Sequence, residues 1–253
     1  MKKLILLPLM MIALFNCAGN KPDTAFDLKE RFESGKEFLD NEKYLRAQEA
    51  FQYILIRRTG SDLGDDAQFY LGESYFLNKE YLLAISEYEK LTRKMAFSPY
   101  VEKARYRICE AYEIESPKYY HDQTYSQKAL ERYQEFIDDF PYSDKGSIAL
   151  EAMSTLRNKM AKKVYETGVL YHKMDEHESS IFAYKQLLQN YYDTEYVEYA
   201  HFGMVKSYCL LGDLEKALDY LDNNGHHIVS ETLQNDVEKY LENTEKKIAK
   251  ANK

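Results

Sequence analysis

The chain has 253 residues with only 10 glycines and 5 prolines, and its formal net charge is −8. So few helix-breaking residues over this length favour an all-α fold and argue against a β-sandwich or barrel. Acidic and basic residues are interspersed without a basic stripe, which argues against nucleic acid as a partner.

The N-terminal residues have the pattern of an export signal. Two lysines precede an apolar run over residues 4–15, which is too short to span a bilayer but suits a secretory signal peptide. The run ends in Leu14-Phe15-Asn16-Cys17 and resembles a bacterial lipoprotein signal, in which the cysteine is lipidated. That resemblance implies a signal peptide over residues 1–16 and a diacylglyceryl group with an added acyl chain, such as palmitate, on Cys17. The alternative is an ordinary secretory signal with an incidental cysteine.

Residues 17–25 are predicted to form the lipidated cysteine and a flexible tether, because the stretch after Cys17 is polar and contains glycine and proline. Two or more acyl chains give stable membrane anchoring. Ala18 follows the cysteine, and by resemblance to lipoprotein sorting in proteobacteria this favours the outer membrane. The two remaining cysteines, Cys109 and Cys209, lack CxxC spacing and are predicted to be buried thiols.

One spacing of small and aromatic residues recurs along the rest of the chain. In the stretch Asp66–Leu91 it is Gly72 with an aromatic residue three positions later, alanine twelve later and tyrosine sixteen later. The repeated sets are Gly35, Phe38, Ala47 and Phe51; Gly72, Tyr75, Ala84 and Tyr88; Gly168, Tyr171, Ser180 and Tyr184; Val205, Tyr208, Ala217 and Leu221; and, with eight inserted residues removed, Cys109, Tyr112, Ala129 and Tyr133.

This spacing predicts helical hairpins. A small residue lets two helices cross closely, and an aromatic residue one turn away fills the space toward the next hairpin. The period of about 37 residues is typical of helical solenoids. The four positions resemble the consensus of tetratricopeptide repeats. We therefore predict an all-α superhelical solenoid of five such hairpins.

The predicted helix pairs are 25–40 with 43–58, 65–78 with 81–95, 100–114 with 124–139, 144–174 with 177–190, and 195–211 with 214–222. Residues 26–143 would hold repeats one to three, and residues 144–253 a long strut helix, repeats four and five and a capping helix. The capping helix lies in Ser230–Lys253, where Leu233, Val237 and Leu241 form one apolar stripe. Its alternative is docking to a partner.

Two irregularities make the resemblance more specific. The eight inserted residues fall within the stretch 116–125, which separates the helices of the third hairpin, and the first helix of the fourth hairpin is extended into a strut. With Cys17 and the stretch Phe136–Ser143, these features resemble the BamD-like family of outer-membrane assembly lipoproteins.

The BamD-like resemblance implies a non-enzymatic scaffold on the periplasmic face of the outer membrane, assisting the insertion of β-barrel proteins. Implied partners are the barrel-forming insertase subunit with periplasmic repeat domains, other assembly lipoproteins and unfolded outer-membrane substrates. The alternative is a periplasmic repeat lipoprotein that coordinates cell-wall or envelope enzymes.

No enzymatic motif occurs in the sequence. GxSxG, GxxxxGK(S/T), HExxH and GxGxxG are all missing, so neither catalytic residues nor a cofactor are expected. His172 and His177 are five residues apart and share no helix face, so no metal pair is predicted. The six histidines are expected to be solvated.

A peptide-binding groove is the best candidate for a site. Mapping the groove positions of tetratricopeptide repeats selects Phe69, Glu73, Phe76, Tyr106 and Glu110. Phe69 and Phe76 are seven residues apart and lie on one helix face, where they could hold aromatic residues of an extended peptide. The alternative, left open by the sequence, is that these rings pack against the neighbouring repeat.

Overall fold

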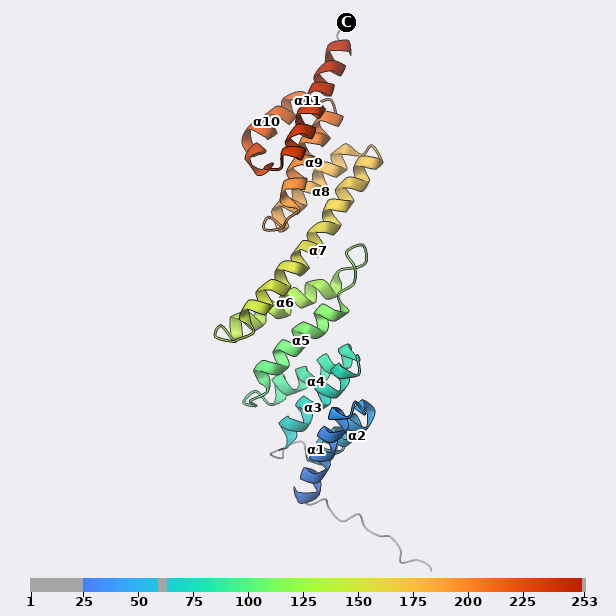
Figure 1. Cartoon of the computed structure of the whole chain (residues 1–253), viewed down its shortest axis with the longest axis vertical. Helices are drawn as coiled ribbons and strands as arrows, with labels where there is room; N and C mark the ends of the chain where they lie inside the picture. The colour runs from blue at the N-terminus through green and yellow to red at the C-terminus, as the bar shows by residue number, and fades with distance from the viewer. Residues whose placement is uncertain (1–24, 59–62, 252–253) are drawn as a thin grey trace, which may run out of the picture.

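A computed structural model describes residues 25–58 and 63–251 of the chain. In these residues all regular structure is helical, and the helices stack along one long axis with the C-terminus at one end (Figure 1). The predicted signal peptide, the lipidation site Cys17 and residues 18–24 of the tether lie outside the described residues.

The helices form five consecutive hairpins followed by one further helix. Their bounds agree with the predicted ranges to within two residues. They are α1 (Ala25–Asp40), α2 (Tyr44–Arg58), α3 (Gly64–Leu77), α4 (Tyr81–Lys94), α5 (Val101–Glu115), α6 (Thr124–Asp139), α7 (Gly146–Lys173), α8 (His177–Asn190), α9 (Val197–Leu210), α10 (Leu214–Asn224), a short 3-10 turn (Gly225–His227) and α11 (Glu231–Ala251).

The small and aromatic positions meet as the spacing predicts. A Cβ atom added to Gly72 on α3 would lie 2.5 Å from Cε1 of Tyr88 on α4, and one added to Gly168 would lie 2.5 Å from Cε1 of Tyr184. Both tyrosines are buried. The aromatic ring of the second helix therefore lies directly against the backbone of the first helix, where only glycine leaves room.

The second small position is buried in every hairpin. Four of its occupants are alanines with no exposed surface: Ala47, Ala84, Ala129 and Ala217. The fifth is Ser180, whose hydroxyl donates a hydrogen bond of 2.8 Å to the carbonyl oxygen of Gly168. A buried hydroxyl must be paired, and here it ties the two helices of the fourth hairpin together.

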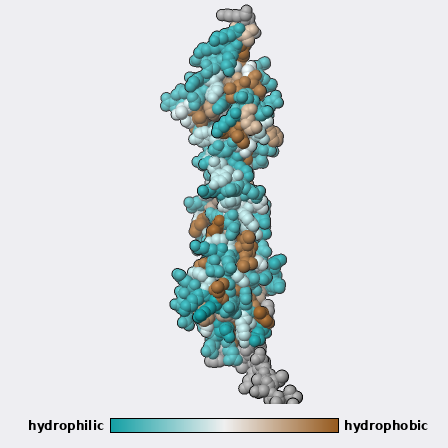
Figure 2. Space-filling model, turned by 90° about the vertical axis from the view of Figure 1, so that its right-hand side faces the viewer, coloured by the Kyte–Doolittle hydropathy of each residue, from teal (hydrophilic) through white to brown (hydrophobic). Residues whose placement is uncertain are grey.

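Helix α7 has 28 residues and joins the first three hairpins to the last two. Its first half packs on α6 and its second half on α8 and α9 (Figure 1). Figure 2 shows that the molecule narrows at this level and that its surface there is mostly hydrophilic. The strut predicted from the uninterrupted helical stretch after residue 143 is present.

Helix α11 covers the end of the solenoid. Val237 is buried against Val205 and Cys209 of α9, with Leu233 and Leu241 packed at the edge of the same cluster. The hydroxyl of Thr244 donates to the carbonyl oxygen of Cys209 at 3.2 Å. The predicted apolar stripe therefore closes the last hairpin. Cys109 and Cys209 are free and buried, as predicted.

The prediction that the histidines are solvated is wrong for His201. Its side chain is 6% exposed, and its Nδ1 lies 2.8 Å from the hydroxyl of Tyr220. His201 also stacks on the exposed His227 with the ring centroids 4.4 Å apart. His172 is half-buried and contacts Tyr184. Both residues face the adjacent helix rather than water, because first helices of a solenoid are packed on two sides.

Among residues 25–58 and 63–251, no group of histidine, cysteine and carboxylate side chains is arranged to hold a metal ion. Within the same ranges no helix combines the length and the apolarity needed to cross a membrane.

Candidate functional site

The five residues predicted to line a groove lie on α3 and α5, the first helices of the second and third hairpins. Phe69, Glu73 and Phe76 are on α3, and Tyr106 and Glu110 are on α5. Both helices pack against α4, which lies between them in the chain. The structure brings three of the five together and places the other two in packing contacts.

Phe69 is fully buried in the core. Its ring stacks on Tyr100, with centroids 4.5 Å apart and planes 12° from parallel, and Lys103 lies over the ring at 4.8 Å. Tyr100 precedes the next hairpin, so this is the packing alternative that the sequence left open. A peptide could reach Phe69 only by displacing Tyr100.

Glu73 is the centre of a charged network. Its side chain is nearly buried and accepts a hydrogen bond of 2.5 Å from the hydroxyl of Tyr88. Arg107 of α5 donates to the same carboxylate from Nε at 2.8 Å and from Nη2 at 3.0 Å. The remaining nitrogen, Nη1, donates to Glu110 at 2.9 Å. A paired guanidinium thus satisfies the buried carboxylate and links two adjacent repeats.

Phe76 completes this group, because the Arg107 guanidinium lies 4.6 Å from its ring centroid. The ring also contacts Tyr81 edge-on at 5.3 Å. Tyr106 is not part of this group, because its ring packs against Phe136 and Tyr133 of α6. Phe76 and Glu110 are only partly buried, so they are the predicted groove residues that a peptide could contact at the network.

The network keeps Tyr88 and Arg107 protonated. Burial and the Glu73 carboxylate raise the pKa of Tyr88 far above its ordinary value, so its hydroxyl stays a donor. Burial acts to lower the pKa of Arg107, but the hydrogen bonds and charges of Glu73 and Glu110 outweigh it and raise the pKa. Arg107 is thus ion-paired to two carboxylates beside the apolar ring of Phe76, an arrangement that suits packing and peptide contact better than proton transfer.

Sequence reasoning did not single out Arg107, although its position carried a signal. It follows its partner Glu73 by 34 residues, and Tyr100 follows its partner Asp66 by the same number. In both pairs the first residue lies on α3 and the second lies at or just before the next first helix, α5. A polar or charged residue about one repeat after a carboxylate therefore predicts a contact between neighbouring hairpins.

The turn before α5, residues 95–100, is held in place by two carboxylates at the start of α3. The hydroxyl of Ser98 donates to Asp65 at 2.7 Å, and that of Tyr100 donates to Asp66 at 2.7 Å. Phe97 projects from this fixed turn with its side chain fully exposed. Asp65 and Asp66 thus hold this turn in place, and they also lie in the first turn of α3, where negative charge is favourable.

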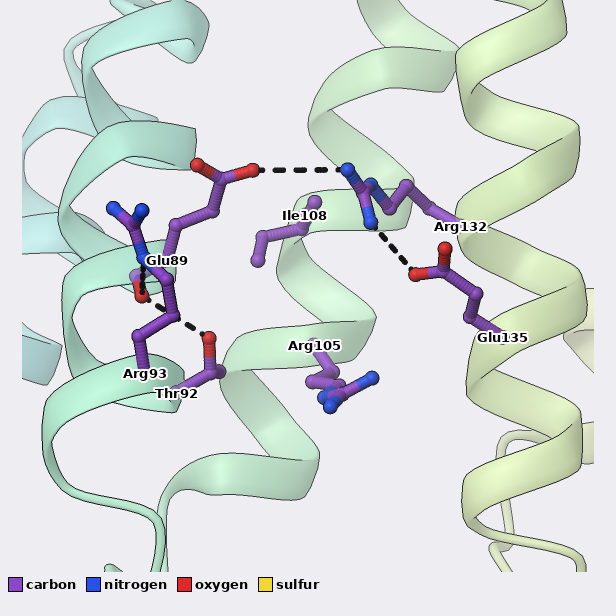
Figure 3. Close-up of a pocket in the computed structure, with 7 residues that line it drawn as sticks. All are labelled: Glu89, Thr92, Arg93, Arg105, Ile108, Arg132 and Glu135. Atoms are coloured by element: carbon purple, nitrogen blue, oxygen red, sulfur yellow. Dashed lines mark hydrogen bonds and ion pairs between the residues drawn. The ribbon is translucent and has the colours of Figure 1, made fainter.

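A hollow of about 440 Å³ lies across α4, α5 and α6 (Figure 3). Ile108 lies at its centre, and Arg132 spans it, with Nη2 3.9 Å from Glu89 and Nη1 2.7 Å from Glu135. Arg93 is bonded through Nε to the carbonyl oxygen of Glu89 at 3.2 Å. The arginines and glutamates that line the hollow are similar in number and pair with each other. The hollow is therefore a set of ion pairs between helices and does not carry charge of only one sign.

Residues 24–221 match the family model described as YfiO, outer membrane lipoprotein. The chain belongs to the YfiO family. The matched region covers the first four hairpins, α9 and most of α10, and it stops before α11. Membership associates the chain with the outer membrane.

A curated relative is the outer membrane protein assembly factor BamD of Rickettsia prowazekii (strain Madrid E). It is 23% identical over 225 residues, which cover 85% of this chain and 87% of the relative. Similar solved structures include a thermophilic TPR protein of Thermus thermophilus, with 15% identity, a TM-score of 0.36 and coverage of 85% of this chain and 98% of that one. The TPR2AB domain of yeast Sti1 in complex with pHSP90 has 13% identity, a TM-score of 0.40 and coverage of 88% and 100%.

Proposed function

We propose that this chain is a non-enzymatic lipoprotein scaffold of the machinery that folds and inserts β-barrel proteins into the outer membrane. The observation that carries the proposal is the YfiO family match over residues 24–221, together with the assembly-factor relative. The groove residues agree with it, because their polar groups are engaged in packing contacts and none is arranged as an acid, base or nucleophile.

The proposed anchor is a lipid on Cys17, with residues 18–24 as the tether to the first hairpin. An outer membrane lipoprotein family supports this arrangement. Two or three acyl chains suffice for stable attachment. The solenoid would then face the periplasm and present its long surface to other subunits and to unfolded barrel proteins.

We propose that the insertase subunit docks on the last two hairpins. Leu170 and Met174 near the end of α7 are 54% and 59% exposed, and Leu211 after α9 is 44% exposed. These apolar side chains lie at the ends of the first helices α7 and α9, which contact each other, and together they offer an apolar surface for a partner. Unfolded substrates would contact the first three hairpins, where Phe76 and Phe97 are accessible.

Purification of the tagged protein in mild detergent, with mass-spectrometric identification of bound chains, tests the proposal. Recovery of a large outer-membrane β-barrel protein with periplasmic repeat domains is expected. The substitutions Leu170→Asp and Met174→Asp should reduce that recovery, whereas Leu82→Asp on the exposed face of α4 should not. Recovery of cell-wall enzymes alone would contradict the proposal and would favour the alternative, a repeat lipoprotein that coordinates those enzymes.

A further inference from the structure

A second hollow lies where the insertion of the third hairpin meets the strut. Its volume is about 530 Å³, which is within the usual range of about 300–1,000 Å³ for ligand pockets. The insertion contributes Lys118, Tyr119 and Tyr120 to its lining, α7 contributes Lys159 and Lys162, and the turn before α9 contributes Tyr196.

The insertion that forms one wall is held in a single conformation by Gln123. This buried side chain donates from Nε2 to the carbonyl oxygens of Lys118 at 2.9 Å, Tyr119 at 3.3 Å and His121 at 3.1 Å. Its Oε1 accepts from the hydroxyl of Ser126 at 2.7 Å. A loop fixed in this way loses little further freedom on binding, so the wall is preorganised.

The strut holds the same loop from the other side. Lys159 donates to the hydroxyl of Ser116, and Lys163 donates to the carbonyl oxygen of His121 at 2.8 Å. Lys162 lies 4.7 Å from the ring centroid of Tyr119. The hollow is therefore a built junction between two elements that are 40 or more residues apart in the chain.

The junction has more basic than acidic side chains, although the chain as a whole is acidic. The stretch from Arg157 to Lys163 has four basic residues and no acidic one, while the chain has a net charge of −8. Among residues 25–58 and 63–251, no carboxylate lies within ion-pair distance of any of four lysines at the junction, although Glu195 lines the hollow and Glu113 and Asp122 act on Lys159 and Lys163 over longer distances. These four are Lys118, Lys159, Lys162 and Lys163. Burial lowers the pKa of Lys159, so a negative charge beside it would be favourable.

Tyrosines from two elements line the hollow. Tyr119 and Tyr120 of the insertion contact each other edge-on at 5.3 Å, and Tyr120 is 57% exposed. Tyr196, in the turn before α9, also lines the hollow and is braced by Tyr165 at 5.6 Å. Tyrosine rings of this kind offer apolar faces together with hydroxyl groups, which is typical of surfaces that recognise peptides.

We propose that this hollow binds an acidic segment of a partner protein that presents an aromatic or aliphatic side chain between carboxylates. The lysines without ion pairs would meet the carboxylates, and the three tyrosines would enclose the apolar side chain. The inference rests on the proposed function, since it names the chemistry by which the scaffold holds one of its partners. Charge complementarity selects a peptide with carboxylates rather than a basic or neutral one.

Fluorescence anisotropy tests the site with a fluorescein-labelled nonapeptide that contains two phenylalanines among aspartates and glutamates. Saturable binding that weakens with added salt is expected. Lys118→Glu with Lys162→Glu should weaken it about tenfold or more, because two attractive contacts become repulsive. Tyr120→Ala, which leaves the lysines in place, should weaken it several-fold. Circular dichroism confirms that each variant is folded.

The matched control is Lys94→Glu with Lys247→Glu, which makes the same charge change on exposed faces of α4 and α11. It should bind the acidic peptide as the parent does. If both double variants weaken peptide binding equally, the loss depends only on the net charge of the protein, and the proposal is wrong. Equal binding of a peptide with lysine in place of each acid would also overturn it.

A third arm separates a peptide from a lipid headgroup. If vesicles of phosphatidylglycerol bind at the same lysines while the acidic peptide does not, the peptide proposal is wrong. Failure of the proposed function has a different signature, because loss of the β-barrel partner in detergent purification would leave peptide binding intact. The two readouts are therefore independent.

Discussion

The close crossing of α3 and α4 makes Gly72→Ala an informative substitution. The added Cβ would lie 2.5 Å from Cε1 and 2.7 Å from Cδ1 of Tyr88, well inside van der Waals contact. Tyr88 has no exposed surface, and its hydroxyl is held by Glu73. The ring can move away only by breaking that hydrogen bond or by pushing α4 outward.

Two opposing effects set the magnitude. Overpacking in a well-packed core typically costs about 1–3 kcal/mol. Replacing glycine by alanine inside a helix contributes about 0.5–1 kcal/mol of stability. Overpacking is the larger effect here because the ring is fixed at both ends, so the free energy of unfolding should fall by about 1–2 kcal/mol.

Urea denaturation followed by far-ultraviolet circular dichroism measures this change. Gly146→Ala is the matched control, because a Cβ at Gly146 meets nothing within 4 Å, and it should leave stability unchanged or slightly raised. Combining Gly72→Ala with Tyr88→Leu should cost less than the two single changes added together, since leucine leaves room for the methyl group. If Gly72→Ala alone is as stable as the parent, the helices do not cross as closely as described.

Three further results are expected. Arg107→Ala leaves Glu73 buried without its ion pair and should lower the free energy of unfolding by about 2–3 kcal/mol, whereas Arg107→Lys should lower it less; equal losses would contradict the network. Burial lowers the pKa of His172 and His201 to about 4, so the unfolded chain binds protons more readily between about pH 6.5 and pH 4. The melting temperature should therefore fall as the pH drops through that window. The loss should correspond to about 1–2 kcal/mol of unfolding free energy after allowance for solvent screening. His201→Phe should make the melting temperature depend less on pH. Cys17→Ala should move the protein from the membrane fraction to the soluble fraction after cell fractionation, and an unchanged membrane fraction would refute the lipid anchor.

The fold could be predicted from the sequence because its determinants are local and repeated. The pairing of Gly72 with Tyr88, and of Gly168 with Tyr184, lies within one hairpin, so the sequence separation directly encodes the contact. The insertion and the strut were visible as breaks in that spacing. The helix ends were predictable as well, because the turns between paired helices are only a few residues long except at the insertion of the third hairpin.

The candidate site could be predicted only in part, because it depends on how one hairpin is rotated on the next. Phe69 and Phe76 share a helix face, yet Tyr100 covers the first and leaves the second accessible. Burial of His201 likewise depends on the position of Tyr220 in the next helix. The three bonds from Gln123 that order the insertion have no sequence pattern, since a glutamine in a loop is usually solvated.

The central claim is that this chain assists the assembly of outer-membrane β-barrel proteins. Depletion of the protein in its native host, followed by pulse-chase measurement of heat-modifiable folded barrels, tests it most directly. The account predicts that folded barrels accumulate several-fold more slowly while unfolded precursors build up in the periplasm. Normal barrel folding during depletion, with defects confined to the cell wall, would contradict it.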